Sequence, residues 1–168
     1  YLQKPKDLQG YRIATNSKEQ ITTQGFSLGI NYYVGKYLEL NGNYSWNKLN
    51  KQSNDPIIPA YNTPEHKFNL GITGRNISII NDKINNIGFN LNYKWIEGFI
   101  FEGSPQFTGL VPTYFLLDFQ LNKYFPEQKL TIKSGASNLL NNKTLQVYGG
   151  PFVGRMIYLS LLFDWGNK

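Results

Sequence analysis

The residues of this chain that could do chemistry are few and stand far apart. His66 is the only histidine and cysteine is absent, so no second ligand is spaced for a metal site and no thiolate can act as a nucleophile. Glu39 and Asp118 could form an acid pair, but nothing in the sequence sets their distance. We interpret both as solvated or lysine-paired groups and His66 as a residue at a strand end.

A glycine-rich segment, Gly149-Gly150-Pro151 with Gly154, is the other feature that could suggest a reaction. It does not match a phosphate-binding loop, because no strand precedes it, no helix follows it and the Lys-Ser/Thr ending is absent. We interpret it as the loop before the last strand. The sequence therefore predicts no enzymatic activity, no catalytic residue, no metal and no cofactor.

Aromatic loops are the candidate binding residues. The segment IEGFIFEGSPQFTG carries three phenylalanines beside polar groups, and three residues elsewhere join the same uncertain set: Phe99, Phe101, Glu102, Gln106 and Phe107, with Tyr61, Tyr148 and Arg155. Aromatic rings with polar neighbours suit recognition of a sugar or a peptide. The alternative is that these loops pack on one another over the mouth of a barrel.

Composition narrows the class of protein. The chain has 168 residues and a net charge of +6, but its Lys and Arg residues are scattered singly, so nucleic-acid binding is not expected. No run approaches the roughly 18 apolar residues of a spanning helix. It begins at Tyr1 without a signal peptide, so we expect that a leader was removed or that this is a piece of a longer chain.

About eight segments alternate apolar and polar residues as β-strands do. They are 10–15, 25–35, 38–47, 67–75, 87–95, 115–122, 130–137 and 155–165. Short turns at 35–36, 76–86 and 125–128 alternate with long loops at 48–64, 96–112 and 138–154. This pattern predicts an all-β antiparallel meander.

The two faces of the predicted strands differ in a way that favours a membrane. Charges inside the strands fall on the polar face, and the apolar face is expected to carry none: Glu39, Lys67, Lys94, Asp118, Lys133 and Asp164. Aromatic residues gather on the apolar face near strand ends: Tyr32, Tyr44, Trp46, Tyr93, Trp95, Phe163 and Trp165. Because the last strand runs the opposite way, this indicates two girdles, one at each water boundary.

We therefore predict a transmembrane β-barrel in preference to a soluble β-sandwich. The apolar bands span about nine residues, close to the length that a tilted spanning strand needs. The polar face is rich in Gly, Ser, Asn and Thr, which suits a wet or plugged lumen. Since lipid tolerates no open sheet edge, the strands must close alone as a small barrel or belong to a larger ring.

Four segments carry a family resemblance. They are NSKEQITTQGFSLGINYYVGKYLELNGNYSWNK, YNTPEHKFNLGI, KSGASNLLNNK and GRMIYLSLLFDW. Together they resemble the C-terminal part of the barrel of TonB-dependent outer-membrane transporters of the Bacteroidetes type. Leu140 stands where the family more often has Phe, and residues 166–168 follow Trp165, at which the family's chains end.

The resemblance implies an origin and a function for the chain. Residues 1–168 would be the C-terminal part of a barrel of about 22 strands, with the plug domain absent from this chain. The whole receptor would lie in the outer membrane of a Gram-negative bacterium and import a scarce nutrient: a siderophore, vitamin, glycan or peptide. Its partners would be the rest of the barrel, the plug, the TonB complex acting through the plug, outer-membrane lipids and a surface lipoprotein.

The resemblance also implies an orientation, with the long loops outside the cell and the short turns in the periplasm. Two other hypotheses stay open. One is a self-contained barrel of about eight strands with a structural or adhesion role. The other is a soluble β-domain that binds glycan through its aromatic loops.

Overall fold

The computed structural model describes residues 22–50, 61–79, 84–103 and 107–165. Strands and their connections make up all of this part of the chain, and no helix occurs within it. All seven predicted strands that fall in these ranges form, which confirms the all-β prediction. The predicted strand 10–15 and the candidate residue Gln106 lie outside the described residues.

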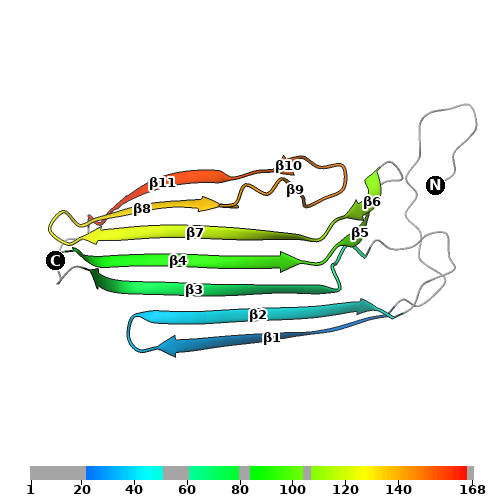
Figure 1. The fold of residues 1–168 in the computed structure, drawn as a ribbon, viewed down its shortest axis with the longest axis horizontal. Helices are drawn as coiled ribbons and strands as arrows, with labels where there is room; N and C mark the ends of the chain where they lie inside the picture. The colour runs from blue at the N-terminus through cyan, green and yellow to red at the C-terminus, as the bar shows by residue number, and fades with distance from the viewer. Residues whose placement is uncertain (1–21, 51–60, 80–83, 104–106, 166–168) are drawn as a thin grey trace, which may run out of the picture.

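One seven-stranded sheet dominates the molecule, in the order β1-β2-β3-β4-β7-β8-β11 (Figure 1). Every neighbouring pair is antiparallel, and successive long strands lie side by side, so the predicted meander is confirmed. The strands are β1 (Thr23–Val34), β2 (Leu38–Leu49), β3 (His66–Ile79), β4 (Ile84–Ile96), β7 (Tyr114–Phe125), β8 (Leu130–Ser137) and β11 (Met156–Phe163).

Two loops contain structure that the sequence reading missed. The loop predicted at 96–112 folds into a hairpin of β5 (Phe99–Glu102) and β6 (Thr108–Val111), and that at 138–154 contains the short pair β9 (Thr144–Leu145) and β10 (Phe152–Val153). The sequence predicted long loops there and missed these short strands. The segments Phe-Ile-Phe and Thr-Gly-Leu-Val have strand-forming residues, but they are too short to stand out by periodicity.

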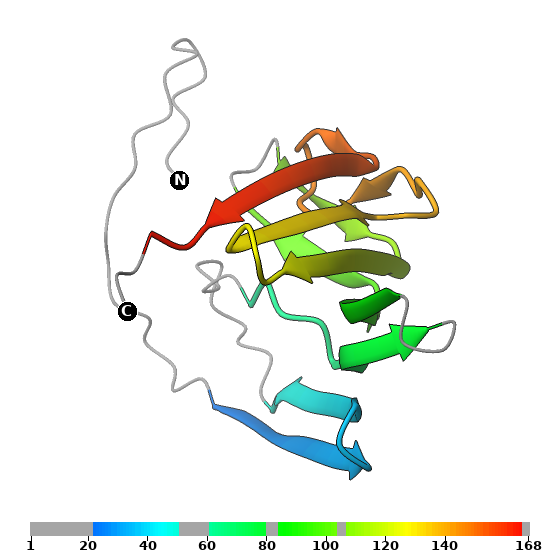
Figure 2. The same ribbon diagram turned by 90° about the vertical axis from the view of Figure 1, so that its left-hand side faces the viewer.

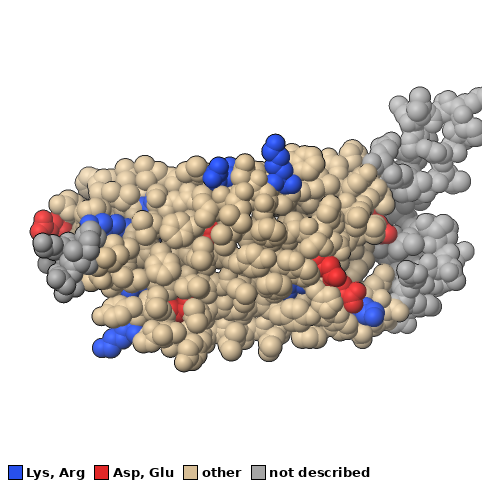
Figure 3. Space-filling model, in the orientation of Figure 1, with Lys and Arg blue, Asp and Glu red and all other residues tan. Residues whose placement is uncertain are grey.

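The sheet is a single curved layer that does not close. Figure 2 shows it end-on as an open arc, with β1 and β11 at its two edges. In the described part of the chain, neither edge strand has a second neighbour, and no helix or second large sheet covers either face. On the face shown in Figure 3, charged side chains are few and most of the surface over the strands is uncharged.

Strand register gathers the aliphatic side chains on one face, which we call the apolar face. Its exposed aliphatic members include Leu28, Ile30, Leu40, Leu70, Ile72, Leu121, Ile157, Leu159 and Leu161. They are exposed, up to 78% for Ile157. Among the described hydrophobic residues only Val111 and Ala136 are buried. The sheet therefore lacks the apolar core that stabilises a water-soluble domain.

The opposite face, which we call the polar face, is mostly small and amide-bearing. Cross-strand hydrogen bonds join Ser27 Oγ to Ser45 Oγ at 2.9 Å, and Asn90 Nδ2 donates to Thr73 Oγ1 at 2.8 Å. Apolar side chains are not excluded from this face, since Leu116, Met156 and Leu162 fall on it by register. The division of the two faces agrees with the alternation in the sequence.

Two details depart from the predicted pattern. The turn predicted at 76–86 is shorter, because β3 continues to Ile79 and β4 starts at Ile84, with register shifts after Gly74 and Ile77. Asn76 and Asn86 adopt φ of 51° and 55° there, a conformation that asparagine tolerates. Also, Lys123 shares the apolar face with Leu121, so that face is not free of charge.

Lys123 lies near the end of β7, where a charged group can reach water. Its Nζ sits 4.9 Å from the ring centroid of Phe125. A long side chain can lay its stem along apolar surface and keep its ammonium in water. The charge is therefore compatible with an apolar face whose boundary lies at this end of the strand.

The β1–β2 turn provides a test of the hairpin. Gly35 has φ of 63°, whereas Gly29 lies within β1, and a Cβ at either position would meet no atom closer than 3.9 Å. Gly35→Ala should lower the free energy of unfolding by about 1 kcal/mol, because alanine is strained at positive φ. Chemical unfolding should show a smaller loss for the control Gly29→Ala. Equal losses would contradict the role of the turn.

Candidate functional site

Aromatic rings lie in a row of two contacting groups, one on β1–β3 and one on β3–β7, across the apolar face at the end of the sheet that carries the long loops. Centroid distances are 5.7 Å for Phe26–Trp46, 5.3 Å for Phe68–Trp95 and 5.9 Å for Tyr93–Phe115. The row consists of Phe26, Tyr44, Trp46, His66, Phe68, Tyr93, Trp95 and Phe115. We call it the aromatic row.

Four of the seven predicted girdle residues belong to this row: Tyr44, Trp46, Tyr93 and Trp95. Tyr32, Phe163 and Trp165 lie at the opposite end of the sheet, beside the short turns. Sequence reasoning missed Phe26, Phe68 and Phe115, which begin or nearly begin their strands. Strand pairing could have identified them, because each of the three lies directly opposite a predicted girdle residue on the neighbouring strand.

Polar groups anchor the row at the loop side. Trp46 Nε1 donates to Glu65 Oε1 at 3.2 Å, and a hydrogen bond of 2.6 Å joins Tyr44 OH to His66 Nδ1. The backbone N–H of His66 donates to Glu97 Oε2 at 3.0 Å. His66 thus serves as a hydrogen-bonded strand-end residue.

No group of three His, Asp or Glu residues able to hold a metal occurs among the described residues.

The candidate loop residues divide between packing and exposure. The ring of Tyr148 lies against Gly109, and the ring of Phe107 lies against Gly149, so closely that a Cβ on either glycine would collide with it. The β5–β6 and β9–β10 segments therefore pack on one another, as the structural alternative expected. Both rings keep part of their surface open, 49% for Phe107 and 36% for Tyr148.

The remaining candidates do not converge on one point. Asn62, next to Tyr61, binds the backbone of Glu102 twice, at 2.7 and 3.0 Å. Phe99 and Phe101 lie in β5. Arg155 is exposed, and its Nη1 donates to the carbonyl oxygen of Leu139 at 3.3 Å. The loops form a connected rim, but the structure does not assemble these residues into a single binding pocket.

A buried asparagine organises the connection after β8. Asn138 is 4% exposed and has φ of 52°. Its Nδ2 donates to the carbonyl oxygens of Asn142 and Val153 at 2.7 and 3.2 Å, while its Oδ1 accepts the backbone N–H of Asn142 at 3.0 Å. Its own backbone N–H donates to Asp118 Oδ1 at 2.8 Å. The segment NLLNNK thus ties β7, β8 and β10 together.

The two candidate carboxylates have separate partners. Asp118 holds the Asn138 backbone, and Glu39 forms an ion pair of 3.4 Å with Arg75. Because they lie on β7 and β2, they do not form an acid–base pair. We interpreted both as solvated or lysine-paired groups, but their partners here are a backbone N–H for Asp118 and an arginine for Glu39.

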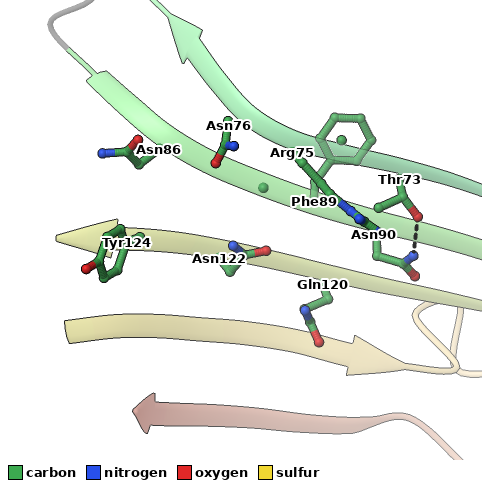
Figure 4. Close-up of a pocket in the computed structure, with 11 residues that line it drawn as sticks. Thr73, Arg75, Asn76, Asn86, Phe89, Asn90, Gln120, Asn122 and Tyr124 are labelled. Atoms are coloured by element: carbon green, nitrogen blue, oxygen red, sulfur yellow. Dashed lines mark hydrogen bonds between the residues drawn. The ribbon is translucent and has the colours of Figure 1, made fainter. Parts of the chain in front are cut away.

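A hollow of about 440 Å³ lies near the β3–β4 turn (Figure 4). Its polar lining comes from three strands and their turns: Thr73, Arg75, Asn76, Asn86, Asn90, Gln120, Asn122 and Tyr124. Gln120 Oε1 also accepts the hydroxyl proton of Tyr158 at 2.9 Å. Side chains of this kind bind water or polar backbone, and they lack the paired acid and base that hydrolytic chemistry needs.

Comparisons of the chain with protein-family models, curated proteins and solved structures found no match. The described residues contain no helix long and apolar enough to cross a membrane. The geometry above is therefore the basis for assigning a function.

Asn138 allows a test of the connection between β8 and β9. Asn138→Ala removes three side-chain hydrogen bonds from a buried site and also strains a positive φ, so it should cost about 3 kcal/mol of unfolding free energy. Asn138→Gly removes the same bonds without the strain and should cost about 1 kcal/mol less. Thermal unfolding of both variants against the parent protein would measure this. Parent-like stability of Asn138→Ala would contradict the anchoring role.

Proposed function

We propose that the chain is a segment of the wall and mouth of an outer-membrane β-barrel. The observation that carries this proposal is the exposed apolar face with an aromatic row across one end. A contiguous apolar surface of this kind is unusual on a soluble monomer and is typical of a surface that another apolar phase covers. Aromatic rings favour the boundary between hydrocarbon and water.

The open edges support a ring larger than this sheet. In hydrocarbon, each unpaired N–H or C=O group of β1 or β11 would cost several kcal/mol, at the order of magnitude known for buried polar groups. Further strands must therefore pair with both edges. We favour strands of the same receptor over a self-contained barrel of about eight strands, because the sheet has not closed on itself in the described part.

We further propose that the complete protein is a TonB-energised receptor that imports a scarce nutrient. The motif resemblance of NLLNNK and of the closing strand supports this, together with long connections at one end and short turns at the other. The plug and the TonB complex would do the energised work, and outer-membrane lipids would surround the wall. This segment would supply wall and loops and carry no reaction.

The soluble glycan-binding hypothesis receives less support. It needs an apolar core, which the described residues do not form, and aromatic rings presented to a ligand. Phe107 and Tyr148 instead use part of their surface in packing the loops together.

Neighbouring residues on β1 test the membrane assignment. Ile30 lies on the apolar face and Asn31 on the polar face, and both are exposed. Ile30→Arg should lower stability in lipid by about 2–4 kcal/mol, the cost of a cation at mid-bilayer. Asn31→Arg, the matched control, should change it by less than about 1 kcal/mol because that face is wet. Unfolding from vesicles would measure both, and equal effects would contradict a lipid-facing apolar face.

A second test addresses the loops. Phe101→Ala in the complete receptor should weaken apparent substrate affinity in energised cells by about fivefold, the scale of one lost aromatic contact. Ile100→Ala, at an exposed β5 side chain outside the candidate set, serves as control and should leave uptake unchanged. Uptake by Phe101→Ala that equals the parent's at every substrate concentration would show that this ring only packs the loops.

A further inference from the structure

A groove of about 330 Å³ lies between the start of β7 and the β9–β10 pair. Its walls are mainly apolar: Leu110, Phe115, Leu145 and Phe152. Two of these hydrophobic residues are largely exposed to solvent, Leu110 at 58% and Phe152 at 68%. The groove is thus shaped for an apolar group, and the aromatic loop packing described above does not fill it.

One residue of this groove has a buried hydroxyl without a partner. Thr144 lines the groove, is 6% exposed, and its Oγ1 makes no hydrogen bond. Buried polar atoms are nearly always hydrogen-bonded, because an unpaired one loses its water without compensation. A ligand with a hydrogen-bonding group beside its apolar part would supply the missing partner.

A cation is carried by the residue before Thr144. Lys143 also lines the groove and is exposed, and no carboxylate in the described ranges pairs with it. An anionic group would therefore find a free ammonium beside an apolar groove, and phosphate is a common partner for lysine.

The groove is continuous with the aromatic row. Phe115 contributes to both, since its ring lies 5.9 Å from that of Tyr93 and also forms part of the groove. Aromatic rows mark the level of lipid headgroups. If the wall spans a membrane, the groove lies at that level, where acyl chains, ester oxygens and phosphates all occur.

We propose that this groove binds one membrane amphiphile, with an acyl chain along Leu110 and Phe152, a polar linker group at Thr144 and an anionic phosphate at Lys143. The proposal rests on the membrane location given above, but not on transport. Lysine near an anionic lipid surface adds attraction that a neutral headgroup does not receive. The site should therefore prefer an anionic lipid to a zwitterionic one with identical chains.

The experiment is native mass spectrometry of the complete protein in an uncharged detergent. It compares phosphatidylglycerol with phosphatidylcholine of the same chains as probes. The parent protein should retain phosphatidylglycerol about fivefold more strongly, and Lys143→Gln should remove that preference without weakening phosphatidylcholine. Lys36→Gln, in the β1–β2 turn at the other end of the sheet, is the charge-matched control and should keep the parent's preference.

Thr144→Val separates a ligand group from a structural one. Valine has nearly the same shape and no hydroxyl, so retention of both lipids should fall about fivefold. Stability of the lipid-free protein should stay the same or rise, because an unpaired buried hydroxyl has been removed. A destabilised lipid-free protein with unchanged lipid retention would show that the hydroxyl serves the fold and would overturn the proposal.

Other outcomes separate this proposal from the proposed function. Lipid retention that neither Lys143→Gln nor Thr144→Val alters would refute the groove site, even if the protein fractionates with the outer membrane. Occupancy of the groove by a peptide or a second copy, seen as a protein mass in place of a lipid, would also refute it. A protein that binds both lipids as expected but imports no nutrient would support the lipid site in the groove and refute the transport proposal.

Discussion

The apolar face of this single-layer sheet must be covered, and its two edge strands must find further partners. Within the described residues neither requirement is met. The long strands bury very little of their own apolar surface, and Ala136 is the only buried hydrophobic residue in them. Hydrophobic burial is the main favourable term in folding, so this sheet must obtain it from outside the described residues. Lipid against the apolar face and further strands at β1 and β11 would supply both requirements.

Strand register determines which side chains lie on the apolar face and which lie on the polar face. The same pairing that sets Tyr93 beside Phe115 sets Asn92 opposite Asp118 on the other face. A slip of one residue would exchange the two faces, so the short turns and the Asn138 anchor protect the aromatic row as well as the fold.

Much of this organisation was predictable from the sequence. Alternation as regular as that of Phe26, Leu28 and Ile30 identifies a strand and its faces without knowledge of its partner. Tyr44, Trp46, Tyr93 and Trp95 could be assigned to one end of the sheet for the same reason. The sequence showed that Glu39 and Asp118 lie on different strands, but it did not identify their partners. The partner of Glu39 lies in a bulge of β3, and the partner of Asp118 lies in the connection after β8.

Other features depend on contacts that periodicity does not encode. The bulges after Gly74 and Ile77 arise from asparagines in a left-handed conformation, and they lengthen β3 and β4 beyond their predicted ends. The packing of Tyr148 on Gly109 joins residues of two different loops, which no local pattern reveals. Phe68 and Phe115 join the aromatic row through register, and register follows from the turns between strands.

The most direct test of a lipid-facing apolar face uses the absence of cysteine from the chain. Single cysteines introduced in turn at positions 26–32 of β1 would carry a spin label in vesicles. Collision with apolar oxygen and with a water-soluble nickel complex would then be measured. A lipid-facing apolar face should give high oxygen and low nickel accessibility at Phe26, Leu28, Ile30 and Tyr32, and the reverse at Ser27, Gly29 and Asn31. Uniformly high nickel accessibility along β1 would contradict it.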